Sequence, residues 1–263
     1  MSSEKFHTLI TGASSGIGFE LAKVFAKKKN NLVLVARSID ALNSLADEIR
    51  LKYGVDVLVL PSDLASEGAC RQIVSQLRAS KISVNILVNN AGFGDHGPFV
   101  SSDEKRLRDM IQVNIVSLVE LTRALLPSMV EKGNGKIMNV ASTAAFQPGP
   151  LMAVYYASKA FVLSFSEALN EELTGQGISV TALCPGPTIS GFQKNANLEK
   201  VPLIESLELP TSEEVAHYGY KALMNNQAVA IHGLINKIGV QSLRFSPRSL
   251  VVKLVKSLQE KRT

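Results

Sequence analysis

Short apolar runs alternate with longer amphipathic stretches along most of the chain. The short runs are rich in leucine and β-branched residues and have the length of buried strands. There are seven of them, at residues 7–11, 32–36, 55–60, 86–89, 136–141, 179–184 and 229–232. The stretches between them place apolar residues three and four positions apart, as at Leu42, Leu45 and Ile49, which is typical of amphipathic helices. Strands that alternate with helices predict an α/β fold, a doubly wound parallel sheet of about seven strands with helices on both faces.

The pattern continues without a linker rich in Pro, Gly or Ser and without an internal repeat, so we expect residues 1–263 to form a single domain. Hydrophobic residues make up 46% and charged residues 19%, which is the balance of a soluble globular protein rather than of a disordered chain. The residues before the first strand lack the apolar run of a signal peptide, and Cys70 and Cys184 lie far apart. We therefore expect a cytoplasmic protein with reduced thiols and, because the histidines are also scattered, no metal site.

The net charge of +5 is concentrated in two places. Residues 27–29 are lysines at the end of an early helix, where cations suit the helix dipole, and further basic residues decorate a C-terminal tail, residues 240–263. Neither cluster interleaves aromatic residues with the bases, so no nucleic-acid partner is expected. The tail also carries an apolar stripe, formed by Leu250, Val251, Leu254, Val255 and Leu258. We interpret this stripe as a helix packed on the body or on a partner subunit, with contact to a membrane surface as the alternative.

The first predicted strand runs into a glycine-rich turn and then into a helical pattern. In parallel sheets of this kind, ligands bind at the carboxyl ends of the strands. Glycines there permit a tight turn and let the backbone approach a diphosphate, whose charge is met by free N–H groups at the helix N-terminus. Turn chemistry alone is the alternative explanation of the glycines. The position of the turn predicts a Rossmann-type dinucleotide site formed by Gly12, Ser14, Ser15, Gly16, Ile17 and Gly18.

The spacing of this turn differs from GxGxxG and resembles the TGxxxGxG turn of the short-chain dehydrogenase/reductase family. Further motifs similar to those of the family follow in its order and approximate spacing, and they extend the resemblance over roughly residues 6–232. They are Asp63-Leu64, Asn89-Asn90-Ala91-Gly92, Asn114, Ser142, Tyr155-xxx-Lys159 and Pro185-Gly186-Pro187-Thr188. The resemblance implies an oxidoreductase that exchanges a hydride between a nicotinamide cofactor and a carbonyl or alcohol.

The end of the second predicted strand bears on the choice between NAD and NADP. Ala36 stands where relatives that use NAD carry Asp, and Arg37 follows with a planar guanidinium suited to phosphate. We therefore expect NADP(H), with Arg37 at the 2′-phosphate, and a surface arginine as the alternative. The resemblance alone implies the other contacts. They are Asp63 and Leu64 at the adenine, Asn90 at the adenine-side ribose, with Ala91 and Gly92 beside it, and Thr188 at the nicotinamide carboxamide, with Pro185 and Gly186 before it.

Tyr155 and Lys159 are four residues apart in a helical pattern, so both side chains project from one face. A Lys⁺ roughly 4 Å away at an effective dielectric of about 20 would favour the phenolate by up to ~4 kcal/mol, and we expect Lys159 to lower the pKa of Tyr155 toward working pH. Ser142 follows the fifth strand, where its hydroxyl is suited to hold the substrate oxygen against Tyr155. By resemblance, Tyr155 is the acid, Lys159 also holds the nicotinamide ribose, and Asn114 holds a water that relays protons to Lys159.

Apolar side chains dominate the loops expected to enclose the substrate. They are Phe93, Phe99, Phe146, Pro148, Leu151, Met152 and Phe192. Such a lining suits a small apolar ketone or aldehyde, with residues 189–212 as a lid and His96 as a weaker candidate for substrate contact. Alternative hypotheses are an NADP-binding sensor or regulatory protein that retains the fold, and a membrane-surface oxidoreductase of lipids or steroids. By resemblance, we expect a homodimer or homotetramer built from the helices that contain Asn114 and Tyr155.

Overall fold

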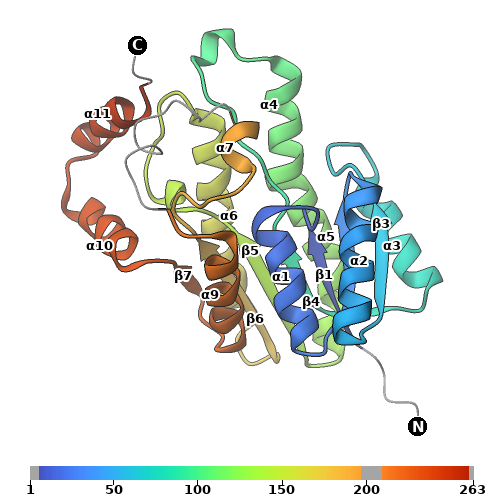
Figure 1. Cartoon of the computed structure of the whole chain (residues 1–263). Helices are drawn as coiled ribbons and strands as arrows, with labels where there is room; N and C mark the ends of the chain where they lie inside the picture. The colour runs from blue at the N-terminus through green and yellow to red at the C-terminus, as the bar shows by residue number, and fades with distance from the viewer. Residues whose placement is uncertain (1–5, 197–208, 261–263) are drawn as a thin grey trace.

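The computed structural model describes residues 6–196 and 209–260 of the chain. Seven parallel strands form one sheet in the order β3-β2-β1-β4-β5-β6-β7 (Figure 1). The strands are β1 Phe6–Thr11, β2 Asn31–Ala36, β3 Val57–Pro61, β4 Ser83–Asn89, β5 Gly135–Val140, β6 Ile178–Cys184 and β7 Val229–Ile231. Each of the seven predicted runs overlaps one of these strands, and the predicted doubly wound, Rossmann-type α/β fold is confirmed.

Helices cover both faces of this sheet (Figure 1). They are α1 Gly16–Lys27, α2 Ile39–Tyr53, α3 Ala69–Ala79, α4 Glu104–Ile111, α5 Ser117–Glu131, α6 Ala153–Glu172, α7 Phe192–Asn195, α9 Ser212–Met224, α10 Leu234–Ser242 and α11 Arg248–Gln259. Short 3₁₀ helices are η1 Phe99–Ser101, η3 Thr143–Phe146 and η4 Leu243–Phe245, and η2 Gln112–Val116 is a π-helical turn. Buried side chains of α1, α2 and α9 form one apolar layer against the sheet, and those of α3 and α5 form the other.

The strand order reverses between β1 and β4, so the carboxyl ends of these two neighbours open a crevice. The Thr11 side chain joins the two ends. Thr11 Oγ1 accepts hydrogen bonds from the backbone nitrogens of Asn90 and Ala91, both at 3.0 Å, and donates to the Val88 carbonyl oxygen at 3.4 Å. The two segments that border the crevice are therefore held in fixed register.

A buried chain of polar side chains crosses the core behind the crevice. Asn89 Nδ2 donates to Asn139 Oδ1 at 2.9 Å and to Thr122 Oγ1 at 3.0 Å, and Asn139 Nδ2 donates to Ser166 Oγ at 2.9 Å. These bonds connect β4 and β5 to α5 and α6. Because buried amides are costly to leave unpaired, the chain fixes where the two helices lie on the sheet.

The continuous helical stretch Glu104–Glu131 is long and apolar enough to cross a membrane by length and composition alone. In the structure, it comprises α4, η2 and α5, and its α5 part lies on the sheet, with Leu121 and Met129 buried in the core. Ser117 Oγ also donates to the Leu64 carbonyl oxygen at 2.7 Å, which joins the helix to the loop after β3. These contacts make it a covering helix of the sheet.

Two predicted segments extend past the described residues. Residues 197–208 of the predicted lid (189–212) and residues 261–263 of the predicted tail (240–263) lie outside them. The described part of the lid contains α7, and a parallel bridge between Ile189 and Thr211 joins its two ends. The described part of the tail comprises the end of α10, η4 and α11, and α11 contains the whole apolar stripe.

Candidate active site

The glycine turn between β1 and α1 makes a close-packed cradle. Gly12 has φ +65°, a left-handed conformation that favours glycine, and a Cβ there would stand 2.8 Å from Asn90 Nδ2. A Cβ on Gly18 would stand 2.4 Å from both Asn90 Nδ2 and the Gly12 carbonyl oxygen. Asn90 Nδ2 occupies this space because it donates to the carbonyl oxygens of Thr11 and Gly12, at 2.9 and 3.2 Å. Both glycines are thus required by close approach of the neighbouring loop.

The N-terminus of α1 is open toward this turn. Its N-cap, Ser15, makes no side-chain capping hydrogen bond, and the first turn contains no acidic residue. The first N–H groups of a helix carry partial positive charge and have no partner within the helix. The residues present therefore fit the diphosphate of a dinucleotide, as predicted for Ser14, Ser15, Gly16 and Ile17, which all line the cavity.

Arg37 lines the same cavity, directly after β2. Its side chain is exposed, and among residues 6–196 and 209–260 the structure records no ion pair for its guanidinium. Ala36 before it is 8% exposed and its carbonyl oxygen accepts from the nitrogen of Ser62 at 2.9 Å. The position leaves the guanidinium available to an anionic ligand in the cavity.

The other predicted cofactor contacts gather on the cavity wall. Asp63, Leu64, Asn90, Ala91, Gly92, Pro185, Gly186 and Thr188 all line it. Asp63 Oδ1 accepts from the nitrogen of Ala65 at 3.1 Å, and Thr188 Oγ1 donates to the Gly186 carbonyl oxygen at 2.9 Å, so both side chains are oriented by their own loops. Of the predicted site residues, Gly18 and Asn114 do not line the cavity, because each is packed behind it.

Tyr155, Lys159 and Ser142 meet at the buried wall of the cavity. Tyr155 and Lys159 lie one turn apart on α6, and Ser142 follows β5 as the N-cap of η3. Lys159 Nζ donates to the Val140 carbonyl oxygen at 2.7 Å and lies 5.8 Å from the centre of the Tyr155 ring. Ser142 Oγ accepts from the nitrogen of Ala144 at 3.1 Å. The structure thus brings the three predicted catalytic side chains together from two elements.

The predicted effect of Lys159 on Tyr155 is wrong for this structure. Burial raises the pKa of the Tyr155 phenol above its usual range, and a hydrogen bond with Ser142 offsets only part of the rise. Burial also lowers the pKa of Lys159 to about 8. The ammonium is directed to a backbone carbonyl rather than to the phenol, so desolvation outweighs its attraction for the phenolate. Tyr155 is consequently a protonated phenol at neutral pH and a weaker acid than a solvent-exposed tyrosine.

Asn114 lies in the π-helical turn η2, next to Lys159. Its Nδ2 donates to the Phe93 carbonyl oxygen and to Ser158 Oγ, both at 3.0 Å, and its Oδ1 accepts from the nitrogen of Phe93 at 3.1 Å. A Cβ on Gly92 would stand 3.0 Å from Asn114 Oδ1 and 3.3 Å from Lys159 Nζ, so both atoms border this glycine. The Asn114 amide therefore joins the loop after β4 to α6, and its role in holding a water stays a prediction.

The cavity measures about 790 Å³, within the range of small-molecule sites. Phe93, Met152 and Phe192 line it as predicted, and the Phe192 ring lies 5.3 Å from that of Tyr155. The other predicted lining residues, Phe99, Phe146, Pro148 and Leu151, do not line it. Phe99 is 67% exposed, and Phe146 packs against a separate apolar cluster behind η3. Apolar character in a loop does not fix the direction of a side chain, which explains this error.

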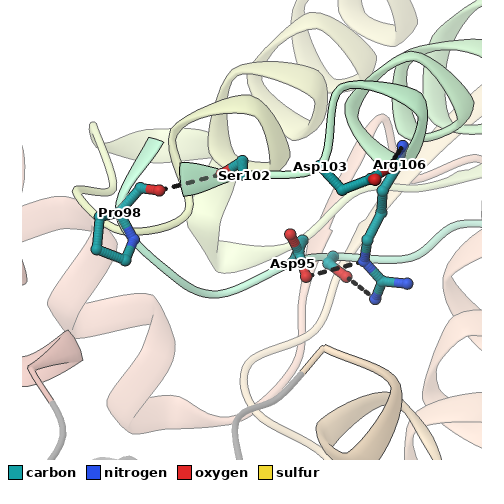
Figure 2. A network of polar contacts seen from close by, with 6 residues as sticks. Asp95, Pro98, Ser102, Asp103 and Arg106 are labelled. Atoms are coloured by element: carbon teal, nitrogen blue, oxygen red, sulfur yellow. Dashed lines mark hydrogen bonds and ion pairs between the residues drawn. The ribbon is translucent and has the colours of Figure 1, made fainter. Parts of the chain in front are cut away.

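Figure 2 shows a network that the sequence analysis missed, in the loop between β4 and α4. Arg106 Nε donates to Asp95 Oδ1 at 2.8 Å, and Arg106 Nη2 donates to the Gly94 carbonyl oxygen at 3.2 Å. Asp103 caps α4 by accepting from the nitrogen of Arg106 at 2.6 Å. The guanidinium also lies 5.4 Å from the centre of the Phe93 ring. The network therefore holds Phe93 at the cavity from the α4 side.

A second set of contacts missed by the sequence analysis ties the C-terminus to α6. Gln259, at the end of α11, lines the cavity, and its Nε2 donates to Tyr156 Oη at 2.6 Å. His96 Nε2 donates to the Gln259 carbonyl oxygen at 2.8 Å. His96 does not itself line the cavity, so its contact is with α11 rather than with the cavity. We call the contacts of Gln259 with Tyr156 and His96 the α11 latch.

The described residues contain no cluster of side chains that could bind a metal ion. Within residues 6–196 and 209–260, no three His, Cys, Asp or Glu side chains are placed to hold an ion together. Cys70 and Cys184 are buried free thiols, and burial raises their pKa to about 11 and about 12. Thiols of this kind are poor nucleophiles at neutral pH.

The sequence profile of short chain dehydrogenases matches residues 7–201 of the chain. The chain belongs to this family. Among curated relatives, ketoacyl reductase HetN of Nostoc sp. is 30% identical over 223 residues, which cover 85% of this chain and 77% of that protein. Very-long-chain 3-oxoacyl-CoA reductase of Anas platyrhynchos is 37% identical over 183 residues, which cover 67% of this chain and 58% of that protein, so the chain spans little more than half of the second relative.

Solved structures of short-chain dehydrogenases agree with the fold over most of its length. The short-chain dehydrogenase from Sphingobium yanoikuyae in complex with NADPH superposes with a TM-score of 0.81 at 33% identity and covers 91% of this chain and 94% of that chain. The chain is accordingly an oxidoreductase of this family, which uses a nicotinamide cofactor, and the residues described above are arranged to receive one.

Proposed function

We propose that the chain is an NADPH-dependent reductase of apolar ketones, with 3-oxoacyl thioesters as the substrate class to test first. The observation that carries the proposal is the protonated Tyr155 phenol at the buried wall of a cavity lined by Phe93, Met152 and Phe192. The same cavity extends to Arg37, whose guanidinium suits a 2′-phosphate. The NADPH-bound neighbour and the two 3-oxoacyl or ketoacyl reductases among the relatives support the cofactor and the substrate class.

NADPH, when bound, supplies a hydride to the carbonyl carbon. The chain's own residues handle the proton that completes the alcohol. The C=O π electrons move to oxygen, which takes the proton of Tyr155 Oη and leaves a phenolate beside Lys159. Ser142 orients the substrate oxygen, and the Lys159 ammonium, which Val140 holds at 2.7 Å, stabilises the phenolate until solvent returns the proton. Burial keeps the phenol protonated but makes it a weaker acid, so proton transfer depends on Lys159 to stabilise the phenolate.

The test is NADPH consumption with a panel of 3-oxoacyl thioesters of increasing chain length, a bulky aryl ketone, a steroid ketone and a ketose sugar. We expect kcat/KM to rise with acyl chain length and the ketose to be the poorest substrate, because the lining is apolar where the substrate meets it. A ketose that is turned over best would contradict the apolar assignment. NADPH binding without turnover of any member would favour the alternative of a sensor that retains the fold.

A further inference from the structure

Seven large apolar side chains are exposed on the C-terminal segment of the chain, where α10 and α11 lie together at one side of the molecule beyond β7 (Figure 1). They are Leu234 (72% exposed), Ile235 (84%), Ile238 (61%), Phe245 (88%), Leu250 (59%), Leu254 (61%) and Leu258 (40%). We call these seven residues the exposed apolar set. Single exposed apolar residues are ordinary, but seven within 25 consecutive residues indicate an interaction surface.

The two rows of apolar residues on α11 have different environments. Val251, Val255 and Gln259 form the buried row, and the two valines pack in a cluster that contains Tyr155. Leu250, Leu254 and Leu258 each precede one of these by a single residue, and form the exposed row, about 100° around the helix. The predicted stripe is therefore split: packing on the body accounts for one row and leaves the other without a described partner among residues 6–196 and 209–260.

The charges of the same segment are almost all positive. Residues 233–260 contain one acidic residue, Glu260, and five basic ones, which gives a net charge of +4. The basic residues are Lys237, Arg244, Arg248, Lys253 and Lys256, and all five are exposed. Apolar side chains with basic residues between them and few acids are the composition of helices that lie in the interface of an anionic bilayer.

We propose that α10, η4 and α11 dock on an anionic lipid surface. Two-fold association of this face with a second copy of the chain would place the same positive patch against itself, and like charges in contact disfavour such an interface. The expected oligomer is also built from other helices, those that contain Asn114 and Tyr155. An anionic bilayer complements this face, because its headgroups pair with the basic residues and its acyl chains accept the apolar ones.

Docking in this way would place the lipid beside the substrate cavity. The exposed row of α11 meets the lipid, while Gln259 on its buried row lines the cavity through the α11 latch. An apolar substrate would then pass between bilayer and cavity without crossing bulk water. The docking itself does not depend on the proposed reaction, because it is measured as binding.

The test is sedimentation of the full chain with vesicles of phosphatidylcholine alone and of phosphatidylcholine with phosphatidylglycerol. We expect the wild type to bind only the anionic vesicles, and less strongly as salt rises. The double substitution Ile235→Ser/Leu254→Ser should lower the partition coefficient at least about tenfold. Leu51→Ser is the matched control, because Leu51 is 92% exposed on α2, outside the proposed surface, and its loss should leave binding unchanged.

Charge substitutions test whether the basic residues of this face contribute to binding. Arg244→Gln and Lys253→Gln should each weaken binding about fivefold. Lys27→Gln and Lys28→Gln at the end of α1 remove equal charge elsewhere and should have no effect of that size. The proposal is overturned by equal binding to both vesicle types, by no binding to either, or by equal effects of both charge pairs. It is also overturned if Ile235→Ser/Leu254→Ser dissociates an oligomer in light scattering, which would assign the face to contact between copies.

Discussion

The two ends of the cavity are built from different materials. At the cofactor end, the wall is mainly backbone, with Gly12 and Gly18 packed so tightly against Asn90 that a Cβ at either position would stand 2.8 Å or less from Asn90 Nδ2. At the substrate end, the wall is made of side chains from separate elements, Phe93 before α4, Phe192 on α7 and Gln259 on α11. Among residues 6–196 and 209–260, no atom is recorded within 4 Å of a Cβ at Gly191, beside α7.

This difference separates what the fold fixes from what it leaves adjustable. A backbone wall is determined by strand register and turn geometry, so it suits a ligand that does not vary, such as a dinucleotide. A wall of side chains on helices that contact the body at few points can change with modest cost in stability, so it suits a substrate that differs between relatives. Tyr155 and Lys159 stand on α6, where the two walls meet.

The largest effect is expected from Tyr155→Phe, which removes the acid and leaves both walls in place. Turnover should fall at least ~10²-fold, because the substitution removes the hydroxyl proposed as the general acid. The affinity for NADPH, measured by fluorescence titration, should stay within about twofold of wild type. Tyr156→Phe on the same helix is the control and should retain most of the turnover. If Tyr155→Phe turned over like wild type, Tyr155 would have no part in proton transfer.

Sequence reasoning worked best where local geometry dictates the residue type. Gly12 needs its positive φ and Gly18 its missing Cβ, and helical periodicity alone places Tyr155 and Lys159 on one face. The seven strands were predicted because buried parallel strands are continuous apolar runs.

It failed where partners are far apart in sequence. The Gln259 to Tyr156 hydrogen bond spans 103 residues, the His96 to Gln259 bond 163, and the Asn89 to Asn139 bond 50. Nothing in the local pattern marks these pairs. The pKa of Tyr155 was misjudged for a related reason, because helical spacing gives the separation of two side chains but not their burial.

Arg37→Ala tests the cofactor end and should leave the substrate end unaffected. A charge-assisted hydrogen bond to the 2′-phosphate contributes roughly 1.5 to 3 kcal/mol, so NADPH affinity should fall by about one to two powers of ten while NADH affinity stays nearly constant. Ala36→Asp should shift the preference further, because a carboxylate repels the phosphate and accepts from a ribose hydroxyl. Separate titrations of both cofactors against the three proteins measure this. Equal weakening of NADPH and NADH by Arg37→Ala would remove Arg37 from the 2′-phosphate site.

The buried charge of Lys159 predicts a dependence of stability on pH. The unfolded chain keeps this lysine protonated up to pH ~10.4, whereas the folded chain releases the proton near pH 8, so the unfolded state binds more protons between these values and stability rises with pH. Relative to Lys159→Met, the wild type should therefore gain about 2 kcal/mol in free energy of unfolding from pH 7 to pH 9.5. Urea unfolding of both ligand-free proteins at the two pH values measures the gain. A constant difference would show that Lys159 is not desolvated as described.

The smallest effect is expected from Gln259→Leu, which removes the side-chain contact of the α11 latch with Tyr156 and keeps the backbone carbonyl that His96 contacts. One neutral hydrogen bond contributes about 1 kcal/mol net, and Leu fills similar volume, so the global melting temperature should fall by only about 2 to 4 °C. The latch joins the tail to α6, so the loss should be local: hydrogen exchange should accelerate in α11 but not in β1, α1 or β4. KM for an apolar ketone should rise a few-fold because Gln259 lines the cavity, while NADPH affinity should be unchanged.

Ser257→Ala, an exposed position on the same helix, is the control for helix propensity. Two results would contradict this expectation: faster exchange throughout the sheet, or a loss of NADPH affinity as large as the change in KM. Either result would show that the substrate end and the cofactor end of the cavity are coupled.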